Sequence, residues 1–171
     1  FERLDRLPAT AEPRKRVVGN PVRRAILDVR DMPYPKVGPE AELQLLIIGG
    51  SQGARLFGEV LPPAICALPE ALRTRLKVVQ QVRQEQLEAV TAVYEAAGVK
   101  TQLSPFFSHM PDLLAKSHMV ISRSGASSVT ELAVVGRPSL LIPLAIAMDD
   151  HQTGNAETLR DAGAADVIQE R

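Results

Sequence analysis

The sequence is poor in cysteine, in long apolar runs and in net charge, and each shortage narrows the class of protein. Its one cysteine, Cys66, cannot form an internal disulfide, which fits a reducing compartment. The 20 basic and 20 acidic residues cancel, so no nucleic-acid-binding surface is expected. The longest apolar runs, such as residues 45–48 and 140–144, have the length of strands. A membrane-spanning helix would need roughly 20 apolar residues.

The composition and the first residues indicate one domain taken from a longer protein. At 171 residues, with 45% hydrophobic and 23% charged residues, the chain resembles an ordinary globular domain. It begins with Phe1 rather than methionine, and prolines interrupt residues 1–40 throughout. Only residues 23–29 could form a short helix there. We expect residues 1–40 to be a connector and residues 41–171 to form one α/β domain.

From residue 43 onward, apolar stretches typical of buried strands alternate with stretches of helical spacing. Strands are expected at residues 43–48, 76–80, 99–103, 118–122, 138–142 and 165–168. Helices are expected at residues 54–68, 85–97, 110–116, 128–135 and 152–162, with a break or kink at Pro62-Pro63. This alternation predicts a doubly wound, parallel, six-stranded sheet of the Rossmann-like α/β type. Ligands bind such sheets at the carboxyl ends of the strands.

The loop after the first strand, Gly49-Gly50-Ser51-Gln52-Gly53-Ala54, opens a helix. Its glycines allow a ligand to approach the backbone closely, and a helix start favours an anion. No Gly-Lys-Ser/Thr follows, so the loop is not a P-loop, and its Gly-Gly-x-x-Gly spacing is not a dinucleotide fingerprint. A tight strand-to-helix turn without a ligand is the alternative interpretation.

The loop after the fourth strand, residues 122–128, repeats this design with a glycine and hydroxyl residues before a helix. Two anion-favouring helix starts at one sheet edge suit a ligand with two phosphates, or with a phosphate and a sugar. Ser128-x-x-Glu131 also matches a capping box. The alternative is that the Glu131 carboxylate accepts hydrogen bonds from a ribose diol.

Polar residues also end the long loop after the fifth strand. His151 and Gln152 are suited to sugar hydroxyls, whereas Asp149 and Asp150 could merely cap the following helix. A metal site in this run is not favoured, because adjacent residues rarely converge on one ion.

After the third strand, Phe106, Phe107 and Met110 are either core residues or neighbours of a planar base. His109 and His118 do not have the spacing of a catalytic pair, and His118 is expected to be structural. The sequence has no Gly-x-Ser-x-Gly elbow, so hydrolase chemistry is poorly supported.

Taken together, these segments closely resemble the C-terminal domain of the bacterial MurG family of glycosyltransferases. The matching segments are Gly19-Asn20-Pro21-Val22-Arg23, residues 49–54, residues 122–126, Glu131, Asp150-His151-Gln152 and Asn155-Ala156, in the family's order. The resemblance implies one half of a GT-B fold, in which two Rossmann-like domains face each other across a cleft. It also implies that residues 1–16 are the tail of the other domain or the connector to it.

The resemblance implies a binding set for UDP-N-acetylglucosamine (UDP-GlcNAc) drawn from all of these loops. The set is Arg23, Ser51, Gln52, Gly53, Phe107, Met110, Gly125, Ala126, Ser127, Ser128, Glu131, His151 and Gln152. The loop around Ser51 and Arg23 would approach the diphosphate, and Glu131 would hold the ribose. The Phe107 backbone and Met110 would frame the uracil.

The remaining members of the set would contact the rest of the donor. Residues 126–128 would line the nucleotide and its phosphates, and His151 and Gln152 would contact the N-acetylglucosamine hydroxyls. The resemblance implies no metal and no cofactor. Helix starts and Arg23 would supply the positive charge that a divalent ion supplies elsewhere.

Two local departures from the family pattern concern loop geometry. Gln80-Gln81-Val82-Arg83 stands where the family usually carries His-Gln-x-Gly, and Ser108-His109 stands where an acidic pair is common. The largest departure is that the family's N-terminal domain, with its acceptor loops and proposed catalytic base, has no counterpart here. We therefore expect no catalytic residue in this chain.

The resemblance implies a whole protein that moves N-acetylglucosamine from UDP-GlcNAc to lipid I, making lipid II for peptidoglycan with inversion at the anomeric carbon. Lipid I and a peripheral contact with the cytoplasmic face of the inner membrane would involve mainly the other domain. Three alternatives remain open. They are a donor-binding subunit of a split two-chain transferase, a UDP-GlcNAc 2-epimerase, and a non-catalytic nucleotide-binding module, perhaps for NAD.

Overall fold

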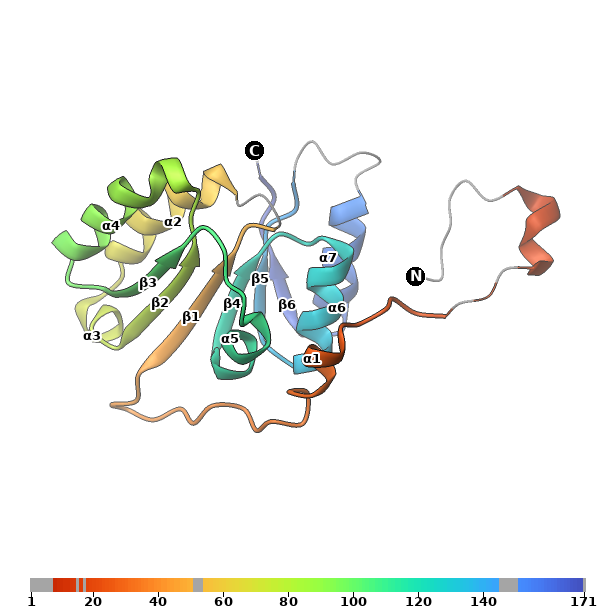
Figure 1. The fold of residues 1–171 in the computed structure, drawn as a ribbon, viewed down its shortest axis with the longest axis horizontal. Coiled ribbons are helices and arrows are strands. Elements are labelled where there is room, and N and C mark those ends of the chain that lie inside the picture. The colour runs from red at the N-terminus through yellow and green to blue at the C-terminus, as the bar shows by residue number, and fades with distance from the viewer. Residues whose placement is uncertain (1–7, 15, 17, 51–53, 145–150, 171) are drawn as a thin grey trace.

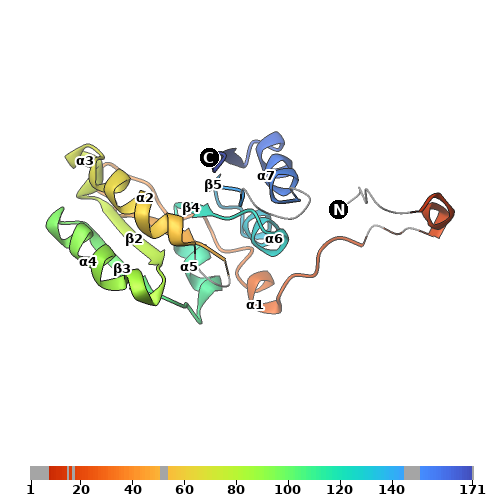
Figure 2. The same ribbon diagram turned by 90° about the horizontal axis from the view of Figure 1, so that it is seen from above.

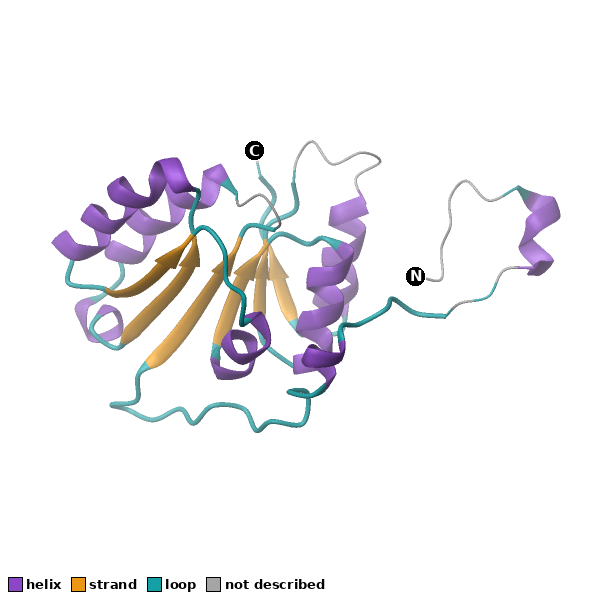
Figure 3. Cartoon of the chain, viewed as in Figure 1, coloured by secondary structure: helices purple, strands orange, loops and turns teal. Residues whose placement is uncertain are grey.

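The computed structural model describes residues 8–14, 16, 18–50, 54–144 and 151–170, which form one parallel sheet between two layers of helices. Figures 1 and 2 show this arrangement from two directions, and Figure 3 separates helices from strands by colour. The strands are β1 (Leu43–Ile48), β2 (Leu76–Gln81), β3 (Lys100–Ser104), β4 (Met119–Ser122), β5 (Ser139–Leu141) and β6 (Ala165–Val167). All six predicted strands are confirmed.

The strand order is β3-β2-β1-β4-β5-β6, and every neighbouring pair is parallel. The order therefore reverses between β1 and β4. At such a point the connections leave to opposite faces of the sheet, and the loops at the carboxyl ends of the two strands diverge. The doubly wound α/β fold is thus confirmed, and its switch point lies where the glycine-containing loops were found.

One face of the sheet is covered by α2 (Arg55–Cys66) and α4 (Leu87–Ala96). The other is covered by α1 (Arg24–Leu27), α5 (Met110–Lys116), α6 (Ala126–Val135) and α7 (His151–Asp161). In β1, Leu45 and Ile47 pack with the first layer, whereas Leu46 packs with the second. Side chains alternate along a strand, so residues on both faces of β1 are buried, which explains the uninterrupted apolar run of residues 45–48.

The helices differ from the predicted ranges in several places. Of the break or kink predicted at Pro62-Pro63, the break is wrong, because α2 continues through both prolines as one helix. Each proline removes one backbone hydrogen bond, and the burial of Phe57, Leu61 and Ile65 against the sheet holds the helix together. The short helix α3 (Glu70–Arg73) and the 3-10 turns Ala9–Arg14 and Gln84–Gln86 were not predicted.

His118 fastens the segment before β1 to the sheet, as expected of a structural histidine. Its Nδ1 accepts a hydrogen bond from the backbone N–H of Gln44 at 2.9 Å, and its Nε2 lies 3.3 Å from the carbonyl oxygen of Lys36. The hydroxyl of Tyr34 donates to the carbonyl oxygen of His118 at 2.6 Å. No helix in the described part of the chain combines the length and apolar character needed to cross a membrane.

Gln80, one of the departures from the family pattern, lies in β2 and forms buried hydrogen bonds with the helices that cover this face of the sheet. Its side chain is fully buried and donates from Nε2 to the carbonyl oxygen of Phe57 at 3.1 Å. Its Oε1 accepts a hydrogen bond from the hydroxyl of Tyr94 at 2.7 Å. Burial raises the pKa of Tyr94, so its hydroxyl remains a donor at neutral pH. Gln80 thereby links α2 to α4.

Replacing Tyr94 with Phe tests this buried link. The substitution leaves the Gln80 carbonyl without its hydroxyl donor, so we expect the free energy of unfolding to fall by about 1–3 kcal/mol. Urea denaturation followed by circular dichroism measures this change. Tyr34→Phe is the matched control, since water can replace that half-exposed hydroxyl and the loss should stay below about 1 kcal/mol. Equal losses in the two variants would contradict the assignment.

Candidate functional site

Two adjoining cavities open at the carboxyl ends of the strands, beside the switch point between β1 and β4. The first has a volume of about 390 Å³ and the second about 750 Å³. Both are lined by Gly50, Ser127 and Ser128, so they meet between the loop after β1 and the first turn of α6. The loops after β1, β3 and β4 were predicted to form a site, and the structure brings them together here.

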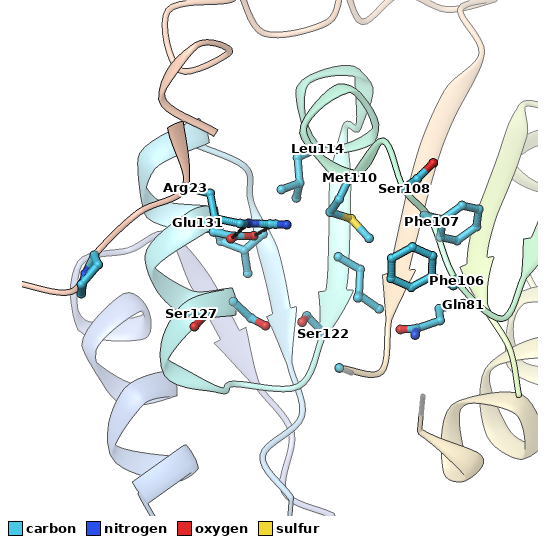
Figure 4. Close-up of a pocket in the computed structure, with 15 residues that line it drawn as sticks. Arg23, Gln81, Phe106, Phe107, Ser108, Met110, Leu114, Ser122, Ser127 and Glu131 are labelled. Atoms are coloured by element: carbon cyan, nitrogen blue, oxygen red, sulfur yellow. Dashed lines mark hydrogen bonds and ion pairs between the residues drawn. The ribbon is translucent and has the colours of Figure 1, made fainter. Parts of the chain in front are cut away.

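The first cavity lies between α6 and the connection from β3 to α5 (Figure 4). Ser127, Ser128 and Glu131 line it from α6, and Arg23 lines it from the segment before α1. Facing them are three residues of the β3–α5 connection and α5, namely Phe106, Phe107 and Met110. The ends of two strands, Ile48 and Ser122, lie between these walls. The cavity therefore has one polar and one largely apolar wall.

Arg23 and Glu131 form a two-pronged ion pair at the polar wall (Figure 4). The Arg23 Nε donates to Oε1 of Glu131 at 2.8 Å, and Nη2 donates to Oε2 at 2.9 Å. The Arg23 side chain is 61% exposed, whereas that of Glu131 is 15% exposed. The hydrogen bonds from Arg23 to the carboxylate raise the arginine's pKa. Two residues that are 108 positions apart in sequence, both in the predicted set, therefore contact each other.

Asn20 holds this arginine-bearing segment against α6. Its side-chain amide donates to the carbonyl oxygen of Ala126 at 3.3 Å and to the hydroxyl of Thr130 at 3.0 Å. In the segment around Asn20 and Arg23, Asn20 therefore attaches the chain to α6, and Arg23 supplies the positive charge. It places a guanidinium beside the cavity although no strand or long helix carries it.

The capping box predicted at Ser128 and Glu131 is wrong. The α6 helix begins at Ala126, with Gly125 as its N-cap residue and no side-chain cap. Gly125 has an extended conformation (φ −59°, ψ 148°), so the chain enters the helix immediately after it. Ser128 is consequently the third helical residue, and Glu131 lies in the second turn, too far along to cap the helix.

This early start of α6 determines which backbone groups face the second cavity. The first hydrogen bond of the helix runs from the N–H of Val129 to the carbonyl oxygen of Gly125. The N–H groups of Ala126, Ser127 and Ser128 precede it and have no partner within the helix. These three residues line the second cavity. The helix start is therefore placed to favour an anion there.

The loop after β1 is anchored by a residue that the sequence had not singled out as functional. Gln81, at the end of β2, accepts a hydrogen bond on Oε1 from the N–H of Gly49 at 3.1 Å and donates from Nε2 to the carbonyl oxygen of Pro105 at 3.2 Å. It thus connects the loops after β1 and β3. Gly50 has a φ of +88°, which favours glycine. Ser51, Gln52 and Gly53, predicted to bind, lie outside the described residues.

The two adjacent phenylalanines have different environments. Phe107 is 6% exposed and belongs to the hydrophobic core, so the simpler interpretation holds for its side chain. Phe106 is 72% exposed and lines the first cavity. Met110, the first residue of α5, lines the same cavity. The segment that the sequence singled out thus lines the first cavity, together with Phe106, which was not in the predicted set.

The start of α7 supports the second cavity through Gln152. Its backbone carbonyl accepts a hydrogen bond from the Ser124 hydroxyl at 2.8 Å, and its Oε1 accepts one from the N–H of Leu144 at 3.1 Å. Asn155 donates from its side chain to the carbonyl oxygen of Ser124 at 3.0 Å. His151 is exposed and, as far as the described residues define the two cavities, lines neither. Residues 149 and 150 lie outside the described residues.

Three arginines, none of them in the predicted set, line the second cavity: Arg55, Arg83 and Arg123. The Arg123 guanidinium is buried and donates to Glu170 at 2.7 Å and to the carbonyl oxygens of Ile142 and Pro143, each at 3.1 Å. Its guanidinium carbon lies 4.8 Å from the centre of the Phe57 ring.

No cluster of three or more His, Cys, Asp or Glu residues suited to a metal ion occurs among the described residues.

Residues 44–171 match the family described as the glycosyltransferase family 28 C-terminal domain. A transferase of Maricaulis maris, named UDP-N-acetylglucosamine--N-acetylmuramyl-(pentapeptide) pyrophosphoryl-undecaprenol N-acetylglucosamine transferase, is 51% identical over 99% of this chain and 46% of its own length. The relative of the same name in Caulobacter vibrioides is 54% identical over 90% of this chain and 42% of its own length. The chain thus spans about half the length of the curated relatives it matches.

Solved structures support the same assignment of fold. MurG of Acinetobacter baumannii has a TM-score of 0.70 and 39% identity, over 79% of this chain and 40% of that chain. WaaG, a glycosyltransferase involved in lipopolysaccharide biosynthesis, has a TM-score of 0.55 and 25% identity, over 77% of this chain and 34% of that chain. The resemblance to the MurG family and the membership in the GT-B fold are confirmed by these relatives.

Replacing Glu131 with Gln tests how the Arg23–Glu131 pair contributes to folding. Because the arginine is largely exposed, we expect the free energy of unfolding to change by less than about 1 kcal/mol. Thermal and urea denaturation measure it. Glu157→Gln, at an exposed pair with Arg160 on α7, is the matched control. A loss of several kcal/mol confined to position 131 would mean that this pair is required for folding.

Proposed function

The chain belongs to the family of glycosyltransferase family 28 C-terminal domains, and from this premise we propose that it binds UDP-GlcNAc for transfer of the sugar to lipid I, which yields lipid II. The observation that carries the proposal is the pair of cavities that meet at Gly50, Ser127 and Ser128. A nucleotide sugar has a nucleoside at one end and a sugar at the other, joined by a diphosphate. The first cavity has an apolar wall, the second is lined by arginines, and the two meet at the start of α6.

We assign the uridine to the first cavity. Its apolar wall, with Phe106 and Met110, suits the faces of a planar base. Backbone groups of the loop around Phe107 can read the edge of the uracil. The opposite, polar wall carries Glu131. This arrangement explains why one cavity combines aromatic and carboxylate groups.

Glu131 can hold the ribose while it remains paired with Arg23. Each carboxylate oxygen accepts one hydrogen bond from the arginine, and each has further lone-pair capacity for a hydroxyl. The ion pair fixes the rotamer of Glu131, which reduces the conformational entropy lost on binding. Arg23 therefore orients the Glu131 carboxylate, which would accept hydrogen bonds from the ribose hydroxyls.

We assign the diphosphate to the junction and the sugar to the second cavity. The first-turn amides of α6 lie at this junction and stabilise negative charge, which grows on UDP as it leaves. Gln152 lines the cavity and can contact the sugar, although its Oε1 already accepts from Leu144. The proposed contacts of Ser51, Gln52, Gly53 and His151 stay predictions.

The reaction also needs a base to remove a proton from the attacking hydroxyl of the acceptor. We propose that this base, the lipid-binding surface and the contact with the cytoplasmic face of the inner membrane lie mainly in another domain. Residues 1–40 would connect to that domain, and residues 41–171 would form the donor half. Curated relatives of about twice this length support this division.

The alternatives are less well supported. A split two-chain transferase is not favoured, since relatives about 50% identical carry the matching region within one longer transferase chain. An epimerase would need its own acid and base carboxylates. Within the described ranges the carboxylates lining the cavities are Glu131 and Glu170, and both are paired with arginines.

Calorimetry with UDP, UDP-GlcNAc and NAD tests the assignment of the ligand. We expect this chain to bind both uridine nucleotides and to bind NAD at least tenfold more weakly, which corresponds to about 1.4 kcal/mol. ADP serves as the control for base recognition, because it offers the same diphosphate with a purine. A preference for NAD or ADP would overturn the uridine assignment.

Replacing Glu131 with Ala tests the ribose contact. Loss of a charged hydrogen-bond acceptor should weaken UDP binding by about 1–3 kcal/mol, and calorimetry measures the change in affinity. Glu157→Ala, an exposed carboxylate on α7, is the matched control and should leave binding unchanged. Unchanged affinity in Glu131→Ala would remove Glu131 from the binding site.

A further inference from the structure

The second cavity carries more positive charge than the resemblance alone accounts for. Among the residues that the structure describes, its charged lining consists of Arg55, Arg83 and Arg123 with one acidic residue, Glu170. Arg123 is buried and its charge is matched by Glu170 at 2.7 Å. The excess therefore rests on Arg55, in the first turn of α2, and Arg83, in the loop after β2.

We propose that Arg55 and Arg83 bind the diphosphate of the nucleotide sugar, on the side of the cavity formed by α2 and the loop after β2. This inference rests on the proposed function and adds two residues to its site. Arg83 is one of the residues at which the sequence departs from the usual pattern of the MurG family.

A nucleotide sugar with its uridine in the first cavity would place its diphosphate near these two arginines. The cavities meet at Gly50, Ser127 and Ser128, so a diphosphate attached to a uridine in the first cavity must pass this junction. Gly125 and Ala126 of the α6 start, Arg55 and Arg83 all line the cavity beyond it. A diphosphate there would have helix amides and guanidinium groups available at once, and arginine recognises phosphate oxygens with paired hydrogen bonds.

The present ion pairs of the two arginines can be exchanged at low cost. Arg55 Nε lies 2.7 Å from Glu59 Oε1, and Arg83 Nη1 lies 3.8 Å from Glu85 Oε1. Solvent-exposed pairs of this kind contribute little to stability. A guanidinium has five N–H donors, so it can keep an acidic neighbour and still donate to a phosphate.

The position of Arg23 leaves a role for a second source of positive charge. In this structure Arg23 donates two hydrogen bonds to Glu131, at the ribose side of the first cavity. Its charge is therefore largely balanced there. Arg55 and Arg83 lie at the other cavity, where the bond between the phosphate and the sugar would be placed.

Charge-removing variants of the full chain test the proposal. We expect Arg83→Gln and Arg55→Gln each to weaken UDP binding roughly tenfold, or about 1.4 kcal/mol, as measured by calorimetry. Binding of uridine, which has no phosphate, should stay unchanged when measured by saturation-transfer NMR. Arg83→Lys, which keeps the charge, should recover part of the loss. Arg160→Gln removes an exposed, paired arginine on α7 and is the matched control.

The outcomes separate the inference from the function on which it rests. If the unaltered chain binds neither UDP nor uridine, the proposed function fails and the inference fails with it. If it binds UDP, and both variants bind UDP equally well, the inference alone is overturned. An equal loss of UDP and uridine binding would also overturn it, because the arginines would then act through the fold. Thermal denaturation of each variant verifies that it folds.

Discussion

The parallel pairing of β1 with β2 on one side and with β4 on the other is the constraint on which the rest of the structure depends. It forces the chain to cover both faces of the sheet, and it makes residues 45–48 of β1 part of one core or the other. It also directs the loops after β1 and β4 away from each other. The two cavities open at this divergence, so the site follows from the topology of the sheet.

Charge within the site is arranged in matched pairs rather than as bare groups. Arg23 holds Glu131 at the first cavity, and Arg123 holds Glu170 at the second. A paired carboxylate has a fixed direction, and its arginine balances its charge. In the proposed site, the positive charge that a ligand meets comes from the start of α6 and from Arg55 and Arg83, which line the second cavity.

The sheet and its site edge could be predicted because local sequence determines them. The apolar run of β1 and the glycines after it are visible without any tertiary information. The first residues of the helices were harder to predict from the sequence. Ser128-x-x-Glu131 matches a capping box, but the helix begins at Ala126, with Gly125 as its N-cap residue. Likewise the Pro62-Pro63 pair indicates a break locally, whereas burial of Leu61 and Ile65 keeps α2 continuous.

The sequence did not predict which side chains contact each other in the site. The contact between Arg23 and Glu131 joins residues 108 positions apart, and no local pattern indicates which oxygen an arginine will meet. Gln81 and Arg83 were noticed only as departures from a motif, and their roles depend on the loops that fold around them. The exposure of Phe106 beside the buried Phe107 depends in the same way on packing.

The buried Arg123 has a consequence for how the protein can change over evolution. Its guanidinium serves one carboxylate, two carbonyl oxygens and an aromatic face at the same time. A neutral side chain at position 123 would remove the counter-charge of Glu170, and a change at 170 would leave a buried cation. Positions 123 and 170 are therefore expected to be inherited as a unit, substituted together or retained together across homologous sequences.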